Sequence, residues 1–160
     1  MKKLFLLLIF ILLCSPIFAA DDLPNHVGWV NDFAGILDAG TKAKLTAIID
    51  SLEKKNGAEI AVVTVKEVGE NYTPKDFATA LFKKWGIGKK GVDSGVLFLV
   101  SIGDRRVEIE TGYGVEGVLT DGKSGEILDT YVVPYFKKND YPGGILAGVD
   151  AIVALLAPVD

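Results

Sequence analysis

Apolar residues recur along the chain with two different spacings, and these predict alternating helices and strands. From Ala39 to Asn56 the apolar positions return with the period of a helix that buries one stripe. Asp38 before this stretch is a typical N-cap residue, and Gly57 after it is a typical helix stop. Residues 59–65, EIAVVTV, are a short apolar run of strand length. The pattern therefore predicts a helix followed by a buried strand.

A second helix and a β-hairpin are predicted in the middle of the chain. Residues 73–76, TPKD, supply a cap, a proline at the first helical position and an acidic first turn, and Gly86 ends that helix. Residues 95–100, GVLFLV, are apolar throughout, as in a strand covered on both faces, whereas residues 106–111, RVEIET, alternate. The polar GDRR between the two runs predicts an antiparallel hairpin.

The last third of the chain has a helical pattern. Beyond Glu116 we expect helix through Glu126 to Val133, a break at Pro134, and a final helix from Tyr141 to Ala157. Strand, helix, strand, hairpin and further helices together predict an α/β fold. It is a three-layer α/β/α sandwich with a small mixed sheet of three to four strands flanked by helices, whose longest crossover partners are parallel.

The N-terminus has the organisation of a secretory signal peptide. Residues 1–20 contain a basic head, an apolar run and a small-residue exit, and the apolar run is shorter than the roughly 20 residues that span a membrane. We therefore expect cleavage after residue 19 or 20, no stable transmembrane anchor in the mature chain, and a periplasmic or secreted location. Residues 21–36 are interpreted as a leader arm into a domain over residues 37–160, and the whole domain covers about residues 27–157.

Composition then excludes several classes of function. The only cysteine, Cys14, lies in the predicted signal peptide, so the exported chain has no thiolate chemistry and no disulfide. The only histidine, His26, lies in the leader arm, which argues against a Ser-His-Asp triad. Loss of Lys2 and Lys3 from the 17 basic residues leaves 15 against 21 acidic residues, a net charge of −6. This charge disfavours nucleic acid and favours cations as partners.

Two glycine patterns overlap in the second half of the chain. Residues 112–117 fit GxGxxG and residues 117–124 fit GxxxxGKS, but neither stands between a parallel strand and a helix as a nucleotide site requires. We expect a glycine-rich connection and no nucleotide. As a minor hypothesis, Gly122, Lys123 and Ser124 at a helix start hold a phosphate oxygen.

The predicted hairpin brings acidic residues toward the glycines. If its turn centres on residues 103–104, facing residues have numbers that sum to about 207, which sets Asp93 opposite the loop glycines Gly112 and Gly114.

Further carboxylates follow near this end of the sheet. Glu116 and Asp121 come soon after the glycines, and the leader arm is expected to bring Asp32 there. Such a set of oxygens predicts a Ca²⁺ or Mg²⁺ site. In the alternative interpretation Asp93 belongs to a turn, Asp121 caps a helix and Glu116 is a solvated charge.

Five ordered segments resemble one family, the TPM domain. They are VNDFAGIL at residues 30–37, GAEIAVVTV at 57–65, KKWGIGKKGVDSGVLFLV at 83–100, DRRVEIETGYGVEGVLTD at 104–121, and the final PYFKKNDYPGGILAGVDAIVALL. The resemblance implies a three-layer domain of exported or lumenal proteins, Ca²⁺ or Mg²⁺ binding in some members, and an acid phosphatase activity in plant relatives. The family's signature falls on Asp32, Asp93, Gly112, Gly114, Glu116 and Asp121. Many bacterial members continue into a membrane segment, so the end of this chain favours a soluble domain.

Two functions follow as expectations. In the first, the exported domain binds a divalent cation and acts as a metal-dependent phosphomonoesterase, since neither a thiolate nor a histidine nucleophile is at hand. In the second, it is a non-enzymatic interaction module that aids the assembly or repair of exported or membrane proteins, and the metal is a structural clip. The partners would be a phosphoester in the first case and another protein in the second.

Overall fold

A computed structural model of the chain describes residues 23–157, so the predicted signal peptide lies outside the described part. Its centre is a sheet with the strand order β1-β2-β3-β4. The strands are β1 (Val30–Asp32), β2 (Glu59–Val65), β3 (Gly95–Ser101) and β4 (Arg106–Thr111). Neighbours among β1, β2 and β3 are parallel, and β4 returns antiparallel to β3. The predicted mixed sheet, the parallel β2–β3 pair and the hairpin are confirmed.

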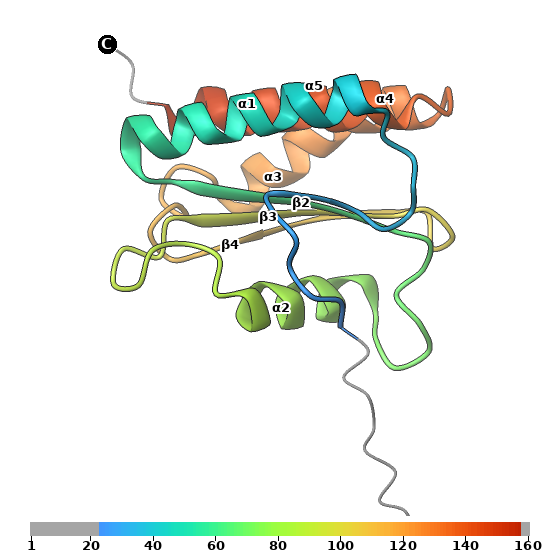
Figure 1. The fold of residues 1–160 in the computed structure, drawn as a ribbon, viewed down its shortest axis with the longest axis horizontal. Helices are drawn as coiled ribbons and strands as arrows, with labels where there is room; N and C mark the ends of the chain where they lie inside the picture. The colour runs from blue at the N-terminus through green and yellow to red at the C-terminus, as the bar shows by residue number, and fades with distance from the viewer. Residues whose placement is uncertain (1–22, 158–160) are drawn as a thin grey trace, which may run out of the picture.

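Helices cover both faces of this sheet (Figure 1). One face carries α1 (Ala39–Asn56), α3 (Asp121–Ile127), the π-helix η1 (Leu128–Val132), α4 (Val133–Phe136) and α5 (Tyr141–Leu156). Among the helices of residues 23–157, the other face carries α2 (Pro74–Trp85) alone. The three-layer α/β/α prediction is confirmed.

Alternation along the central strand divides the core in two. Phe98 of β3 is fully buried and belongs to the cluster under α1 and α5, together with Val96 and Val100. Leu97 and Leu99, between them, belong to the smaller cluster under α2. Because successive side chains of a strand point to opposite faces, an apolar run without interruption is what a covered strand requires.

Capping residues fix the ends of the two helices that follow β1 and β2. Asp38 accepts a hydrogen bond from the Thr41 amide, and Gly57 ends α1 in the left-handed conformation at φ +80°. Thr73 caps α2 in the same way, and Gly86 ends it at φ +62°. The predicted bounds of both helices are confirmed.

The predicted break at Pro134 is wrong. Helical backbone continues past it to Phe136, because the preceding turn widens to a π-helix in which the Val133 amide donates to the carbonyl of Leu128. The wider turn places Pro134 at the start of α4, where its missing N–H and its ring are tolerated.

The sheet has two ends that differ in the connections they carry. We call the end where β3 begins and β4 finishes the glycine-loop end, since residues 112–117 follow it. The opposite end, where β1, β2 and β3 finish and the turn 102–105 joins β3 to β4, is the hairpin end.

Candidate functional site

Backbone hydrogen bonds at the glycine-loop end extend the hairpin ladder beyond its strands. Val96 faces Thr111 in the β3–β4 register. The Gly112 amide then donates to the carbonyl of Gly95 (2.9 Å), and the Gly114 amide donates to the carbonyl of Asp93 (3.0 Å). The predicted pairing of Asp93 with the loop glycines is confirmed.

Glycine is required at both loop positions by the closeness of the facing backbone. A Cβ atom on Gly112 would overlap the carbonyl oxygen of Asp93, and one on Gly114 would overlap the carbonyl oxygen of Val92. Asp93 itself has φ +51°, a left-handed conformation that aspartate tolerates better than most residues. The Asp93 backbone is therefore held in an uncommon conformation by the glycine loop.

The three predicted ligands near this end are exposed but not gathered. Within residues 23–157, the side chains of Asp93, Glu116 and Asp121 form no ion pair or hydrogen bond. Glu116 sits in a turn, between Val115 and Leu119, whose buried side chains anchor it. No group of three or more His, Cys, Asp or Glu side chains in this part of the chain is placed to hold a metal ion.

Asp32 lies at the hairpin end, and the expectation that the leader arm brings it to Asp93 is wrong. In the β1–β2 register Asp32 faces Thr64, one residue before the end of β2. Because β1 and β2 are parallel, the last residue of β1 must lie with the last residues of β2, far from the start of β3.

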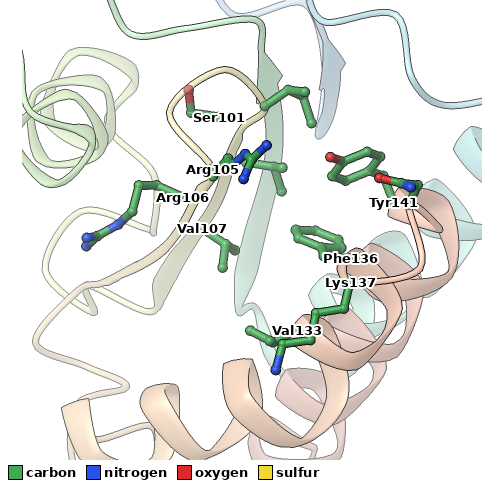
Figure 2. A pocket seen from close by; sticks show the side chains of 11 residues that line it. Ser101, Arg105, Arg106, Val107, Val133, Phe136, Lys137 and Tyr141 are labelled. Atoms are coloured by element: carbon green, nitrogen blue, oxygen red, sulfur yellow. The ribbon is translucent and has the colours of Figure 1, made fainter.

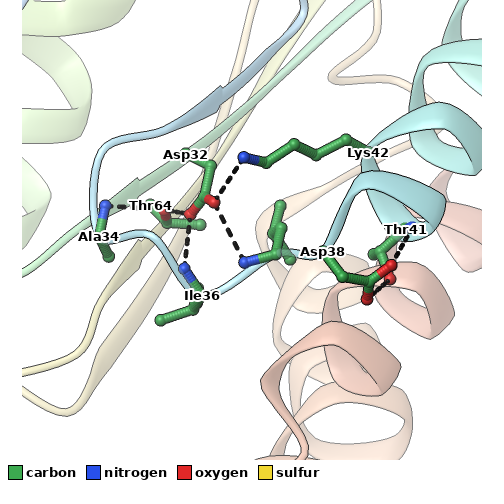
Figure 3. A network of polar contacts seen from close by, with 8 residues as sticks. Asp32, Ala34, Ile36, Asp38, Thr41, Lys42 and Thr64 are labelled. Carbon is green, nitrogen blue, oxygen red and sulfur yellow. Dashed lines mark hydrogen bonds and ion pairs between the residues drawn. The ribbon is translucent and has the colours of Figure 1, made fainter.

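The Asp32 carboxylate instead organises the connection from β1 to α1 (Figure 3). It accepts hydrogen bonds from the Ile36 amide (3.0 Å), the Leu37 amide (3.1 Å) and the Thr64 hydroxyl (2.6 Å), and it pairs with Lys42 at 3.0 Å. Burial alone would raise the pKa of Asp32, but these partners outweigh it and lower the pKa from 3.8 to about 2. Ile36 and Leu37 lie in the connection, Lys42 lies in α1 and Thr64 lies in β2, so the carboxylate fixes the connection to both elements.

At residues 122–124, where a phosphate site was a minor hypothesis, other protein groups already bind the groups that would hold the phosphate. The Lys123 amide donates to the Thr120 hydroxyl, and the Ser124 amide donates to the Thr120 carbonyl. The Lys123 ammonium pairs with Glu126 at 2.8 Å. Thr120, not Asp121, is the N-cap of α3, and α3 has only seven residues. The amides of Lys123 and Ser124 and the Lys123 ammonium are thus already engaged, which leaves few groups here to bind a phosphate.

Exposed apolar side chains around the glycine loop were not predicted. Tyr113, between the two loop glycines, is 83% exposed, and Val92 and Val118 are 60% and 52% exposed. The sequence did contain a signal for the exposure of Tyr113. The residue stands between two glycines, which have no side chains that could cover its ring. The glycine-loop end thus presents both carboxylates and apolar groups to solvent.

In residues 23–157, every helix is too short or too polar to cross a membrane. The most apolar of them, α5, has 16 residues, fewer than the roughly 20 that a span needs.

Solved structures from several bacteria share this fold. The N-terminal domain of a protein from P. gingivalis is 32% identical, with a TM-score of 0.75 over 80% of this chain and 81% of that one. A protein from the psychrophilic bacterium Bizionia argentinensis is 22% identical, with a TM-score of 0.64 over 76% of this chain and 81% of that one. The N-terminal domain of a Corynebacterium glutamicum protein is 16% identical, with a TM-score of 0.62 over 91% and 86%.

The sequence comparison agrees with the structural one. None of the curated proteins matches the chain. The family profile of the TPM domain, however, matches residues 30–155, from the first residue of β1 almost to the end of α5. This match spans the four strands and the described helices up to residue 155, and it confirms the resemblance read from the five sequence segments. The chain therefore belongs to the TPM domain family.

Proposed function

We propose that this chain is an exported TPM domain that binds Ca²⁺ or Mg²⁺ at its glycine-loop end, with Asp93 as the central ligand. Any hydrolysis of phosphomonoesters by this domain depends on that ion. The observation that carries the proposal is the backbone of Asp93, which two glycines hold in a left-handed conformation while its carboxylate is exposed and unpaired within residues 23–157.

The carboxylates of Asp93, Glu116 and Asp121 are suitable ligands for these ions, but their positions suit ion binding only in part. Carboxylates are the oxygen ligands that Ca²⁺ and Mg²⁺ prefer, and both ions fill remaining positions with water or backbone carbonyls. Glu116 and Asp121 are exposed and free to turn, but they are not gathered with Asp93 into a ready-made group. Binding would therefore have to draw them together, which costs affinity. We derive no catalytic step from this arrangement.

The test is a titration of the purified protein with Ca²⁺ and with Mg²⁺, followed by calorimetry and by amide NMR. Loss of the Asp93 carboxylate in Asp93→Ala should weaken binding at least about tenfold, since one charged ligand is worth roughly 1.4 kcal/mol or more. The matched control is Glu67→Ala, which removes the same charge from an exposed position just beyond β2, at the hairpin end. Equal affinity of the wild type and Asp93→Ala would sink the assignment.

A second function, an interaction module for exported or membrane proteins, is favoured by the exposed Tyr113, Val92 and Val118. Apolar groups clustered in this way on a surface commonly mark a site of protein contact. Hydrolysis of p-nitrophenyl phosphate, measured with and without the ion, distinguishes the two functions. Hydrolysis that is lost in Asp93→Ala supports the phosphatase. Ion binding with no hydrolysis supports the interaction module, with the ion as a structural clip.

A further inference from the structure

A cavity of about 380 Å³ opens at the hairpin end of the sheet (Figure 2). The proposed cation site lies at the other end, the glycine-loop end. It lies between the β3–β4 hairpin and the connection from α4 to α5. Its size falls within the roughly 300–1,000 Å³ of ordinary small-molecule sites. The side chains that matter for its chemistry are Arg105, Val107, Val133, Phe136, Lys137 and Tyr141.

The charged residues that line this cavity are all basic. They are Arg105, Arg106 and Lys137, and no Asp or Glu is among the lining residues. The Arg106 guanidinium is already paired with Glu108 at 2.8 Å and points away from the cavity. Arg105 and Lys137 form no ion pair within residues 23–157. The Lys137 ammonium lies beyond Phe136, next to Val133, so Arg105 is the unpaired cation at the hairpin wall of the cavity (Figure 2).

Arg105 occupies its position in an unfavourable backbone conformation. Its φ is +52°, in the left-handed region where glycine or asparagine is common and a long side chain is not. The turn is closed by the Arg105 amide, which donates to the carbonyl of Ile102 at 3.2 Å. A glycine would satisfy this turn without strain. Strain of this kind at a cavity wall points to a use for the side chain itself.

The wall opposite the hairpin is aromatic. Phe136 and Tyr141 both line the cavity, and their ring centroids are 4.9 Å apart at an angle of 57°. Val107 of β4 and Val133 of α4 add to the apolar lining, and both are only half-buried. An apolar surface of this kind gains free energy when a ring or a branched group covers it.

We propose that this cavity binds a small organic anion, with its negative group at Arg105 and its aromatic or branched part against Phe136. Both halves of such a ligand find a partner here: the Arg105 guanidinium binds a carboxylate or a phosphate, and the ring wall binds the apolar part. Neither a bare inorganic anion nor an uncharged aromatic compound satisfies both walls.

The proposal is tested by amide NMR titration of the purified protein with benzoate and with phenyl phosphate, and separately with benzyl alcohol and inorganic phosphate. Both aromatic anions should shift the amides of residues 102–107 and 133–141, and the tighter of the two identifies the preferred headgroup. Benzyl alcohol and inorganic phosphate should bind at least about tenfold more weakly, because each lacks one of the two interactions. Equal binding of all four compounds, or shifts confined to other residues, would refute the proposal.

Variants of adjacent arginines provide the matched control. Arg105→Gly removes the cation and the backbone strain together, so it should fold normally and weaken anion binding about tenfold. Arg106→Gln removes an equal charge one residue away, on the other face of β4, and should change affinity less than about twofold. If Arg106→Gln weakens binding as much as Arg105→Gly, only the overall charge matters and the cavity is not a site.

Discussion

Replacement of Asp32 by alanine should lower the free energy of unfolding by about 3 kcal/mol, with a fall in Tm of roughly 10 °C. The side chain of Asp32 is only 2% exposed, and its loss leaves the amides of Ile36 and Leu37 and the hydroxyl of Thr64 without their acceptor. Denaturation by urea, followed by circular dichroism, measures the change. Glu67→Ala, an exposed acidic residue at the same end of the molecule, should change stability by less than about 0.5 kcal/mol.

Asp32 should also make the free energy of unfolding depend on pH. Because the pKa of Asp32 is lowered to about 2 in the folded protein, its charge stabilises the fold fully above its ordinary pKa of 3.8. About 2 kcal/mol of that contribution is lost as the pH falls from about 4 toward 2. The difference in stability between wild type and Asp32→Ala should therefore narrow over that interval. A difference that stays constant between pH 5 and pH 2 would show that the charge of Asp32 contributes nothing.

Replacement of Gly112 by alanine should cost about 2 kcal/mol of stability and also weaken binding of a divalent cation. The added methyl group would overlap the carbonyl oxygen of Asp93, so either the hairpin ladder or the Asp93 backbone must move. Both movements break the hydrogen bond between Gly114 and Asp93 or its neighbour between Gly112 and Gly95. Thermal unfolding and ion titration of one preparation report the two effects together.

Gly117 supplies the matched control for this substitution. It lies five residues further along the same connection, and a Cβ atom there would meet no other atom within 4 Å. Gly117→Ala should therefore leave both stability and ion binding within error of the wild type. A loss of stability in Gly117→Ala as large as that in Gly112→Ala would mean that flexibility, and not close approach, explains the glycines.

The fold was predictable because local signals agreed with one another. Asp38 and Gly57 bound one helix, and the polar turn after residue 101 fixed the hairpin so closely that Val96 faces Thr111 as the arithmetic of the turn requires. Local capping and strand alternation are properties of a few neighbouring residues, so a sequence displays them directly. The pairing of Asp93 with the glycines followed from the same local arithmetic.

Features that depend on distant packing were not predictable in this way. The place of Asp32 is decided by the parallel pairing of β1 with β2, about thirty residues away, and a leader arm has no local signal for that partner. Pro134 was predicted to break the helix because no local sequence pattern indicates the π-helix that precedes it. Arg105 and Phe136 are about thirty residues apart and line one cavity only through the fold, so this cavity could not be anticipated.

The two outer strands of the sheet bear on how the protein avoids self-association. An unpaired strand edge is a template on which another chain can add a strand, and the risk grows with the length and apolarity of that edge. Here β1 has only three residues, and β4 carries Arg106, Glu108 and Glu110 in alternation, with Glu110 held by Lys75 of α2. A strand arriving at β4 would have to strip water from this row of charges. Concentrated solutions of the protein should therefore resist growth into fibrils through either edge, however apolar its central strands are.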